Sequence, residues 1–81
     1  MMKEKNETSL VSLEKDQHAT IVSIAAGHKA TKRLADLGLT PNTPIKVLRK
    51  AGAHGPIEIK LRGSSLVLGK GIVSKILVKK L

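Results

Sequence analysis

The sequence of 81 residues contains no cysteine, phenylalanine, tyrosine or tryptophan. Without cysteine the chain can form neither a disulfide nor a thiolate metal site, and it has no thiol nucleophile. Without aromatic residues the core must be packed from the 11 Leu, 7 Ile, 6 Val and 7 Ala side chains. A chain of this length supports one domain with a single small core. These absences predict an aliphatic domain that suits a reducing cytosol.

Long apolar stretches are also missing. The first residues, Met-Met-Lys-Glu-Lys-Asn-Glu-Thr, lack the apolar region of a secretory signal. No stretch approaches the ~20 apolar residues that cross a bilayer as a helix. We therefore expect a cytoplasmic protein without a membrane span.

Acidic residues are scarce outside the N-terminal segment. The net charge is +9, and residues 17–81 carry twelve basic but only two acidic side chains. Such an excess attracts acidic surfaces, whether nucleic acid, anionic lipid or an acidic protein face, without selecting among them.

The N-terminal third predicts a tail followed by a strand. Residues 1–9 are polar and charged without apolar periodicity, so we expect a flexible tail there and a domain over residues 10–81. The β-branched run at 18–25 predicts the first strand.

A helix is predicted over residues 28–37, because apolar residues recur there at helical spacing. Gly38 is expected to end it in the left-handed conformation, with Leu39 packed back on Leu34. Pro41 prevents any continuation of the helix.

The second half of the chain predicts strands. Residues 45–48 and 57–62 alternate apolar and polar side chains around a glycine-rich loop with Gly55 and Pro56, which is typical of a hairpin. Pro56 is expected at the first position of its strand, where proline is tolerated.

The last residues allow two interpretations. After a turn at Gly63 and a strand at 66–68, apolar residues beyond 70 fit either a basic amphipathic helix on a membrane surface or a short turn near 69–73 and a closing strand. We favour the strand, because it protects a sheet edge. Five strands with one helix after the first predict a mainly β, SH3-like, partly open barrel.

Catalytic motifs are not found. The segment from Gly63 to Gly71 resembles a Walker A loop, but five residues separate its first two glycines where four are needed, and Gly71 replaces the Ser or Thr that binds magnesium. Ser64 and Ser65 have no His and acid partners nearby in sequence. We expect no enzymatic activity.

Three histidines, His18, His28 and His54, are the available imidazole ligands. None forms a pair at metal-binding spacing, so a site would require the fold or a dimer to gather them. We predict no metal site, and His54, in a glycine-flanked loop, is the first candidate if one exists.

Basic residues on the predicted hairpin suggest a nucleic-acid alternative. Lys46, Lys50, Lys60 and Arg62 would form a stripe along which a phosphate backbone could run. Small barrels that hold single strands also use aromatic stacking, which this sequence cannot supply. Nucleic acid is therefore not our expected partner.

Three motifs in a fixed order resemble the FeoA family. They are R-L-x-x-L-G-L-x-P at 33–41, G-P-I-x-I at 55–59 and R-G-x-x-L-x-L-G at 62–69. Asn42 stands where the family usually has Gly, a mild departure because Asn tolerates positive φ. Asp16-Gln17 replaces the usual Pro-Gly-like turn.

The resemblance implies a function by docking and not by catalysis. FeoA proteins are SH3-like accessory proteins of bacterial ferrous iron transport beside the transporter FeoB, whose cytosolic part contains a GTPase domain. The same module resembles the C-terminal domain of DtxR-type repressors, but this chain lacks a helix-turn-helix. The alternatives that remain are a domain that senses a transition metal ion such as Fe(II), and a basic nucleic-acid-binding barrel.

Docking residues are expected around the helix and its exit, with recruitment to the inner face of the membrane through the partner. The partner-binding candidates are Lys32, Arg33, Leu37 and Leu39. Leu37 and Leu39 could instead be buried as core residues. The expected structural residues are Gly38, Pro41, Gly55, Pro56 and Gly63.

Overall fold

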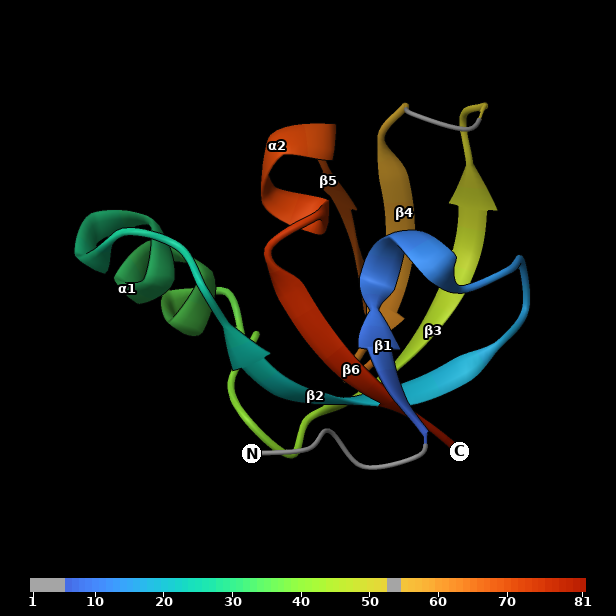
Figure 1. The fold of residues 1–81 in the computed structure, drawn as a ribbon, viewed down its shortest axis with the longest axis horizontal. Helices are drawn as coiled ribbons and strands as arrows, with labels where there is room; N and C mark the ends of the chain where they lie inside the picture. Colours follow the sequence, from blue (N-terminus) through green and yellow to red (C-terminus); the bar gives the residue numbers. More distant parts are fainter. Residues whose placement is uncertain (1–5, 53–54) are drawn as a thin grey trace.

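Six antiparallel strands form one open sheet in the order β1-β6-β2-β3-β4-β5 (Figure 1). The computed structural model describes residues 6–52 and 55–81. Its elements are β1 (Glu7–Ser9), the short 3-10 helix η1 (Leu10–Ser12), β2 (His18–Ile24), α1 (His28–Asp36), β3 (Pro44–Lys50), β4 (Ile57–Leu61), β5 (Ser64–Leu68), α2 (Lys70–Val73) and β6 (Ile76–Lys80). The mainly β, SH3-like fold is as predicted, with one strand more than the sequence indicated.

The additional strand, β1, lies within the predicted tail. Glu7–Ser9 pair with β6, with Thr8 opposite Val78. The prediction of a flexible tail over residues 1–9 is therefore wrong for residues 7–9. Residues 1–5 lie outside the described part of the chain. The segment Glu-Thr-Ser has no apolar alternation of its own. It forms a strand because β6 supplies its backbone hydrogen-bond partners.

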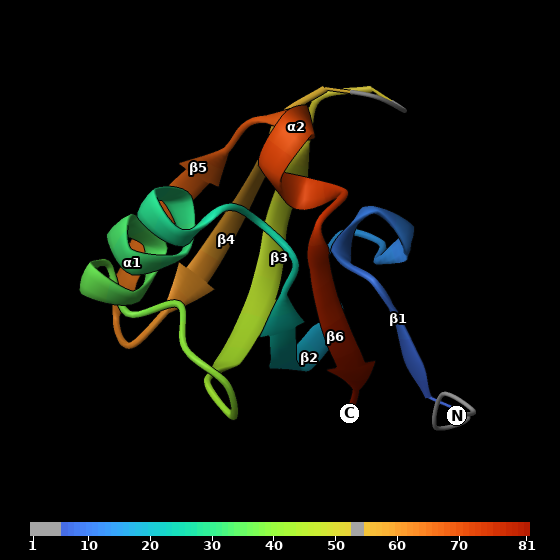
Figure 2. The same cartoon turned by 60° about the vertical axis from the view of Figure 1, so that its left-hand side comes forward.

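The sheet is bent, as Figure 2 shows, and its strand register has two irregularities. The register of β2 against β6 shifts between Ile21 and Ser23, and that of β3 against β4 shifts between Val47 and Arg49. Each extra residue increases the local twist, and the sheet curls around its apolar face.

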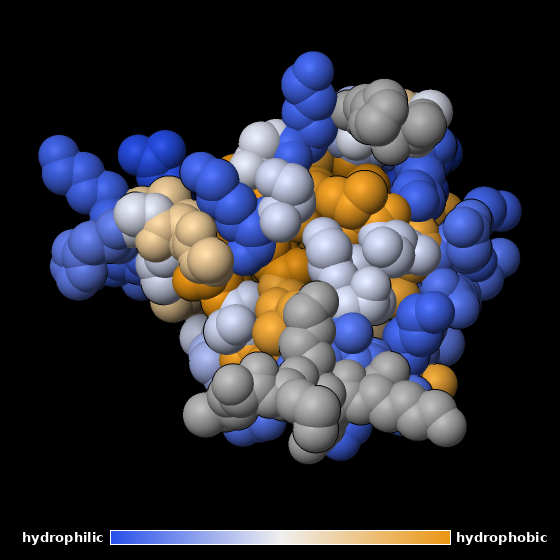
Figure 3. All heavy atoms as spheres, in the orientation of Figure 1, coloured by the Kyte–Doolittle hydropathy of each residue, from blue (hydrophilic) through white to orange (hydrophobic). Residues whose placement is uncertain are grey.

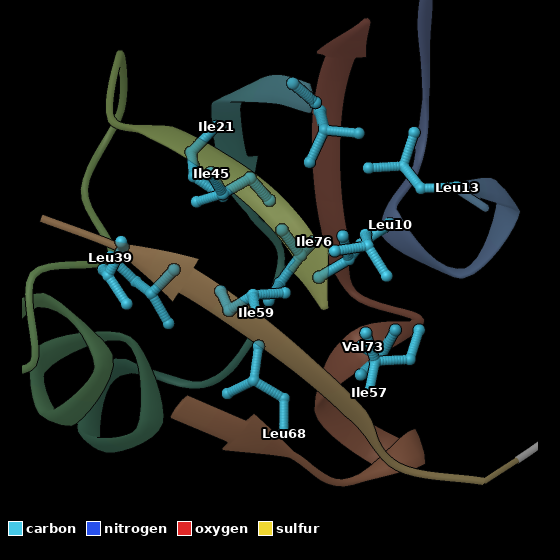
Figure 4. Packing of buried hydrophobic residues seen from close by; sticks show 14 of the residues in the cluster. Leu10, Leu13, Ile21, Leu39, Ile45, Ile57, Ile59, Leu68, Val73 and Ile76 are labelled. Atoms are coloured by element: carbon cyan, nitrogen blue, oxygen red, sulfur yellow. The ribbon is translucent and has the colours of Figure 1, made fainter. Parts of the chain in front are cut away.

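The core is entirely aliphatic (Figure 4). Side chains from every strand except β1, together with η1, α1 and α2, contribute to it. Its buried members are Leu10, Leu13, Ala19, Ile21, Leu34, Leu39, Ile45, Val47, Ile57, Ile59, Leu61, Leu68, Val73, Ile76 and Val78. The core is therefore packed from Leu, Ile, Val and Ala side chains alone, as predicted from the absence of aromatic residues.

The C-terminal segment adopts the favoured interpretation, a short turn and a strand. α2 is one helical turn, and β6 follows it between β1 and β2. Ile76 and Val78 are buried while Lys79 and Lys80 are exposed. The alternative of a long amphipathic helix is wrong, because Ile76 and Val78 face the core from one side of a paired strand, with Leu77 between them on the other side.

Candidate functional site

The exit of α1 presents basic and apolar side chains at the surface. Lys32 and Arg33 are exposed, and Leu37 is 51% exposed. Leu39 is only 1% exposed and belongs to the core, so its place among the docking candidates is corrected. Leu37 follows the last helical residue and points away, whereas the left-handed turn at Gly38 returns Leu39 to the core. We call Lys32, Arg33 and Leu37 the α1 surface.

The helix ends in a Schellman motif centred on Gly38. Its φ is +100°, its N–H donates to the Ala35 carbonyl at 2.9 Å, and the Leu39 N–H donates to the Leu34 carbonyl at 2.9 Å. These two hydrogen bonds join C′ to C2 and C″ to C3, the pattern predicted from the sequence.

The loop after α1 is tied to β2 and back to the helix. The Asn42 N–H donates to the Ile21 carbonyl at 2.7 Å, and the Ile21 N–H donates to the Thr43 carbonyl at 2.9 Å. The buried Thr43 hydroxyl donates to the Gly38 carbonyl at 3.2 Å and lies 2.9 Å from the Thr40 hydroxyl. Asn42 has a φ of 72°, which suits Asn in place of glycine. The α1 surface therefore projects from a well-fixed frame.

The predicted stripe of basic residues is divided between two faces. Lys46, Lys60 and Arg62 lie on the outer side of the sheet, but Lys50 is partly buried and its Nζ donates to the Val11 carbonyl at 3.0 Å. The bulge between Val47 and Arg49 causes the division, because one extra residue reverses the alternation of β3. Sequence alternation alone could not show this reversal.

An apolar pocket of about 220 Å³ lies between η1 and α2, where Figure 3 shows apolar side chains at the surface. Its lining includes Val11, Ile57 and Val73, with Lys50 and Lys70 at its polar positions. No local pattern in the sequence indicates this pocket, since its walls come from four separate elements.

The remaining predicted structural residues occupy turns. A Cβ at Gly55 would collide with the Ala51 carbonyl oxygen. Pro56 precedes β4, where its carbonyl accepts from the Ala51 N–H at 3.1 Å, so it lies just outside the strand and not at its first position. Pro41 is exposed in the loop after α1.

The turn at Gly63 is tighter than predicted. Leu61 pairs with Ser64, so only Arg62 and Gly63 form the loop, and both have positive φ, 50° and 81°. This is the backbone sign pattern of a type I′ hairpin. Ser64 and Ser65, which precede the predicted strand at 66–68, belong to β5.

The histidines are not gathered in the described part of the chain. His18 begins β2, and His28 begins α1. Within residues 6–52 and 55–81 no three His, Cys, Asp or Glu side chains lie close enough to hold a metal ion. His54 lies outside the described residues, so its role stays a prediction.

Comparison with known proteins identifies the chain. Residues 8–80 match the FeoA domain family. The chain belongs to the FeoA family. It is 30% identical over 70 residues to a candidate Fe(2+) transport protein A of Methanocaldococcus jannaschii, covering 86% of this chain and 83% of the relative. FeoA proteins are non-enzymatic accessory proteins, and this one is involved in ferrous iron transport.

Solved structures show the same fold. A crystal structure of an iron uptake regulatory protein (FeoA) superposes with a TM-score of 0.84 at 33% identity, covering 93% of this chain and 99% of that one. A manganese-dependent transcriptional repressor superposes with a TM-score of 0.87 at 18% identity, with 100% of this chain matching 45% of the repressor. The second likeness concerns the fold alone. No helix among the described residues is long and apolar enough to cross a membrane.

Proposed function

We propose that this FeoA protein acts in the cytosol by docking its α1 surface on the cytosolic part of the transporter FeoB. The observation that carries the proposal is Leu37, a large apolar side chain that is 51% exposed beside basic residues. The predicted recruitment to the inner face of the membrane follows from the same contact.

The α1 surface has the chemistry of a small docking site. Arg33 and Leu37 are four residues apart, so they lie along one face of the helix end. Burial of Leu37 would supply apolar contact area, and the Arg33 guanidinium can bind a carboxylate through two hydrogen bonds. The fixed loop of Thr40 to Thr43 means that little backbone freedom would be lost on binding.

The test is an amide NMR titration of the isotope-labelled protein with the cytosolic part of its cognate FeoB. We expect shifts concentrated at residues 28–41. Leu37→Ser and Arg33→Ala should each weaken binding by about tenfold, as expected for loss of about 1.4 kcal/mol at an interface anchor. Circular dichroism of both variants should remain that of the wild type.

Two variants elsewhere provide matched controls. Val67→Thr removes an apolar side chain that is 62% exposed on β5, and Lys75→Ala removes an exposed cation after α2. Both should bind as the wild type does. Unchanged affinity in Leu37→Ser and Arg33→Ala would refute the proposed surface. Ferrous iron and a short RNA are titrated separately, and shifts with either one alone would instead favour the metal-sensing or nucleic-acid alternative.

A further inference from the structure

A second basic surface lies on the outer face of the sheet, and none of its residues belongs to α1. The strand register places His18 opposite Lys46, Lys46 opposite Lys60, and Lys60 opposite Ser65. These side chains therefore form one row across β2, β3, β4 and β5. The three basic residues of this row and Arg62 line a hollow of about 320 Å³. We call His18, Lys46, Lys60 and Arg62 the basic groove.

The row places like charges side by side without compensation. Lys46 and Lys60 are directly opposite on neighbouring strands, an arrangement that destabilises a sheet. None of the three Lys and Arg side chains in the groove forms an ion pair with a residue that the structure describes.

The neighbouring row shows the usual solution. Arg49 lies opposite Glu58, and their charged groups are 4.0 Å apart. A single acid in place of Lys60 would relieve the adjacent repulsion in the same way. The chain keeps the repulsion, which is the pattern of a binding site whose ligand supplies the missing charge.

We propose that the basic groove binds an acidic segment of a protein, in an extended conformation and with at least two carboxylates. Arg62, at the hairpin turn, can donate two hydrogen bonds from its guanidinium to one carboxylate, while Lys46 and Lys60 bind another. The proposal does not depend on docking through α1, because the two surfaces share no residue.

The groove favours an acidic protein over a membrane or an RNA. The exposed large apolar side chains of the described chain are Leu37, Val67 and Leu81, and none lines the groove, so it offers nothing to insert between lipids. Aromatic residues that would stack on bases are absent from the sequence. Its cations surround a hollow, which suits side-chain carboxylates that reach inward.

The probe is a short synthetic peptide of alternating glutamate and serine, titrated into the labelled full chain. We expect amide shifts at His18, Lys46, Lys60 and Gly63 that weaken as salt is added. The decisive variant is Lys60→Glu, and its matched control is Lys75→Glu, which makes the same change of charge outside the groove.

Lys60→Glu should lower peptide affinity by about tenfold, because one attractive contact becomes repulsive. The same variant should raise the melting temperature by roughly 2–6 °C, since it converts a like-charge pair into an ion pair with Lys46. Lys75→Glu should change affinity by less than about twofold.

Equal losses of affinity in the two variants would overturn the proposal, because net charge alone would then explain binding. Absence of shifts with the peptide would overturn it as well. Vesicles of phosphatidylglycerol and a short oligouridine form separate arms, and shifts in the groove with either one but not with the peptide would assign the groove to lipid or RNA. A lower melting temperature for Lys60→Glu would contradict the argument from charge repulsion.

Discussion

Replacement of Gly38 by alanine tests how much the end of α1 depends on one backbone conformation. The φ of Gly38 is +100°, where an L-residue is strained by about 1–2 kcal/mol. A Cβ at this position would also lie 3.3 Å from Cδ1 of Leu61, a contact that requires a small shift of that side chain. The reduced freedom of the unfolded chain offsets part of this cost, by about 0.4–1 kcal/mol. We therefore expect a net loss of about 1 kcal/mol.

Gly71→Ala is the matched control with the opposite sign. Gly71 is exposed inside α2, has no positive φ, and a Cβ there would meet no atom within 4 Å. Alanine is favoured over glycine in a helix by about 0.5–1 kcal/mol. This variant should therefore be slightly more stable than the wild type.

Urea denaturation followed by far-UV circular dichroism measures both changes, because the chain has no tryptophan or tyrosine to report by fluorescence. In a thermal scan followed by the same signal, a loss of about 1 kcal/mol should lower the melting temperature of a domain of this size by roughly 4–8 °C. Gly38→Asn should lose less than Gly38→Ala, since Asn tolerates positive φ better. Equal effects of alanine at positions 38 and 71 would refute the assignment of a left-handed cap.

Two further predictions concern the loops. Thr43→Val should cost about 1–2 kcal/mol, because the buried carbonyl of Gly38 loses a hydrogen bond from the Thr43 hydroxyl, and an unaltered urea midpoint would show that this bond makes no net contribution. Gly55→Ala should lower stability by about 1 kcal/mol or more, because its Cβ collides with the Ala51 carbonyl and the hairpin loop must shift. Gly71→Ala, where a Cβ meets nothing, should lose no stability, and equal losses in the two variants would contradict the collision.

Local signals made α1 predictable from the sequence. Gly38 and Leu39 stand in the spacing of a Schellman motif, and their effect does not depend on distant residues. The strands of the central hairpin, β3 and β4, could also be predicted, because one face of each is buried and apolar residues alternate accordingly. Two of the family motifs, at 33–41 and 55–59, cover the end of α1 and the start of β4.

Features that depend on distant partners could not be predicted. β1 has no apolar pattern and exists because β6 lies beside it. The inward direction of Lys50 depends on a bulge that only the pairing of β3 with β4 reveals. The exposure of Leu37 was open for the same reason, since Leu37 continues the helical spacing of Leu34, which is buried. The basic groove required the cross-strand register, which is not written in any one segment.

The position of β6 in the sheet has a consequence for how the protein is made. β6 is the latest strand in the sequence, yet it separates β1 from β2 and pairs with both. During synthesis the early strands therefore leave the ribosome before the strand that joins them. The apolar residue Ile21 lacks its cross-strand partner Val78 until residues 76–80 emerge. Such distant pairing slows folding. A nascent chain that stalls before Ile76 would present two unpaired strand edges to chaperones and proteases, so quality control can recognise incomplete copies of this protein.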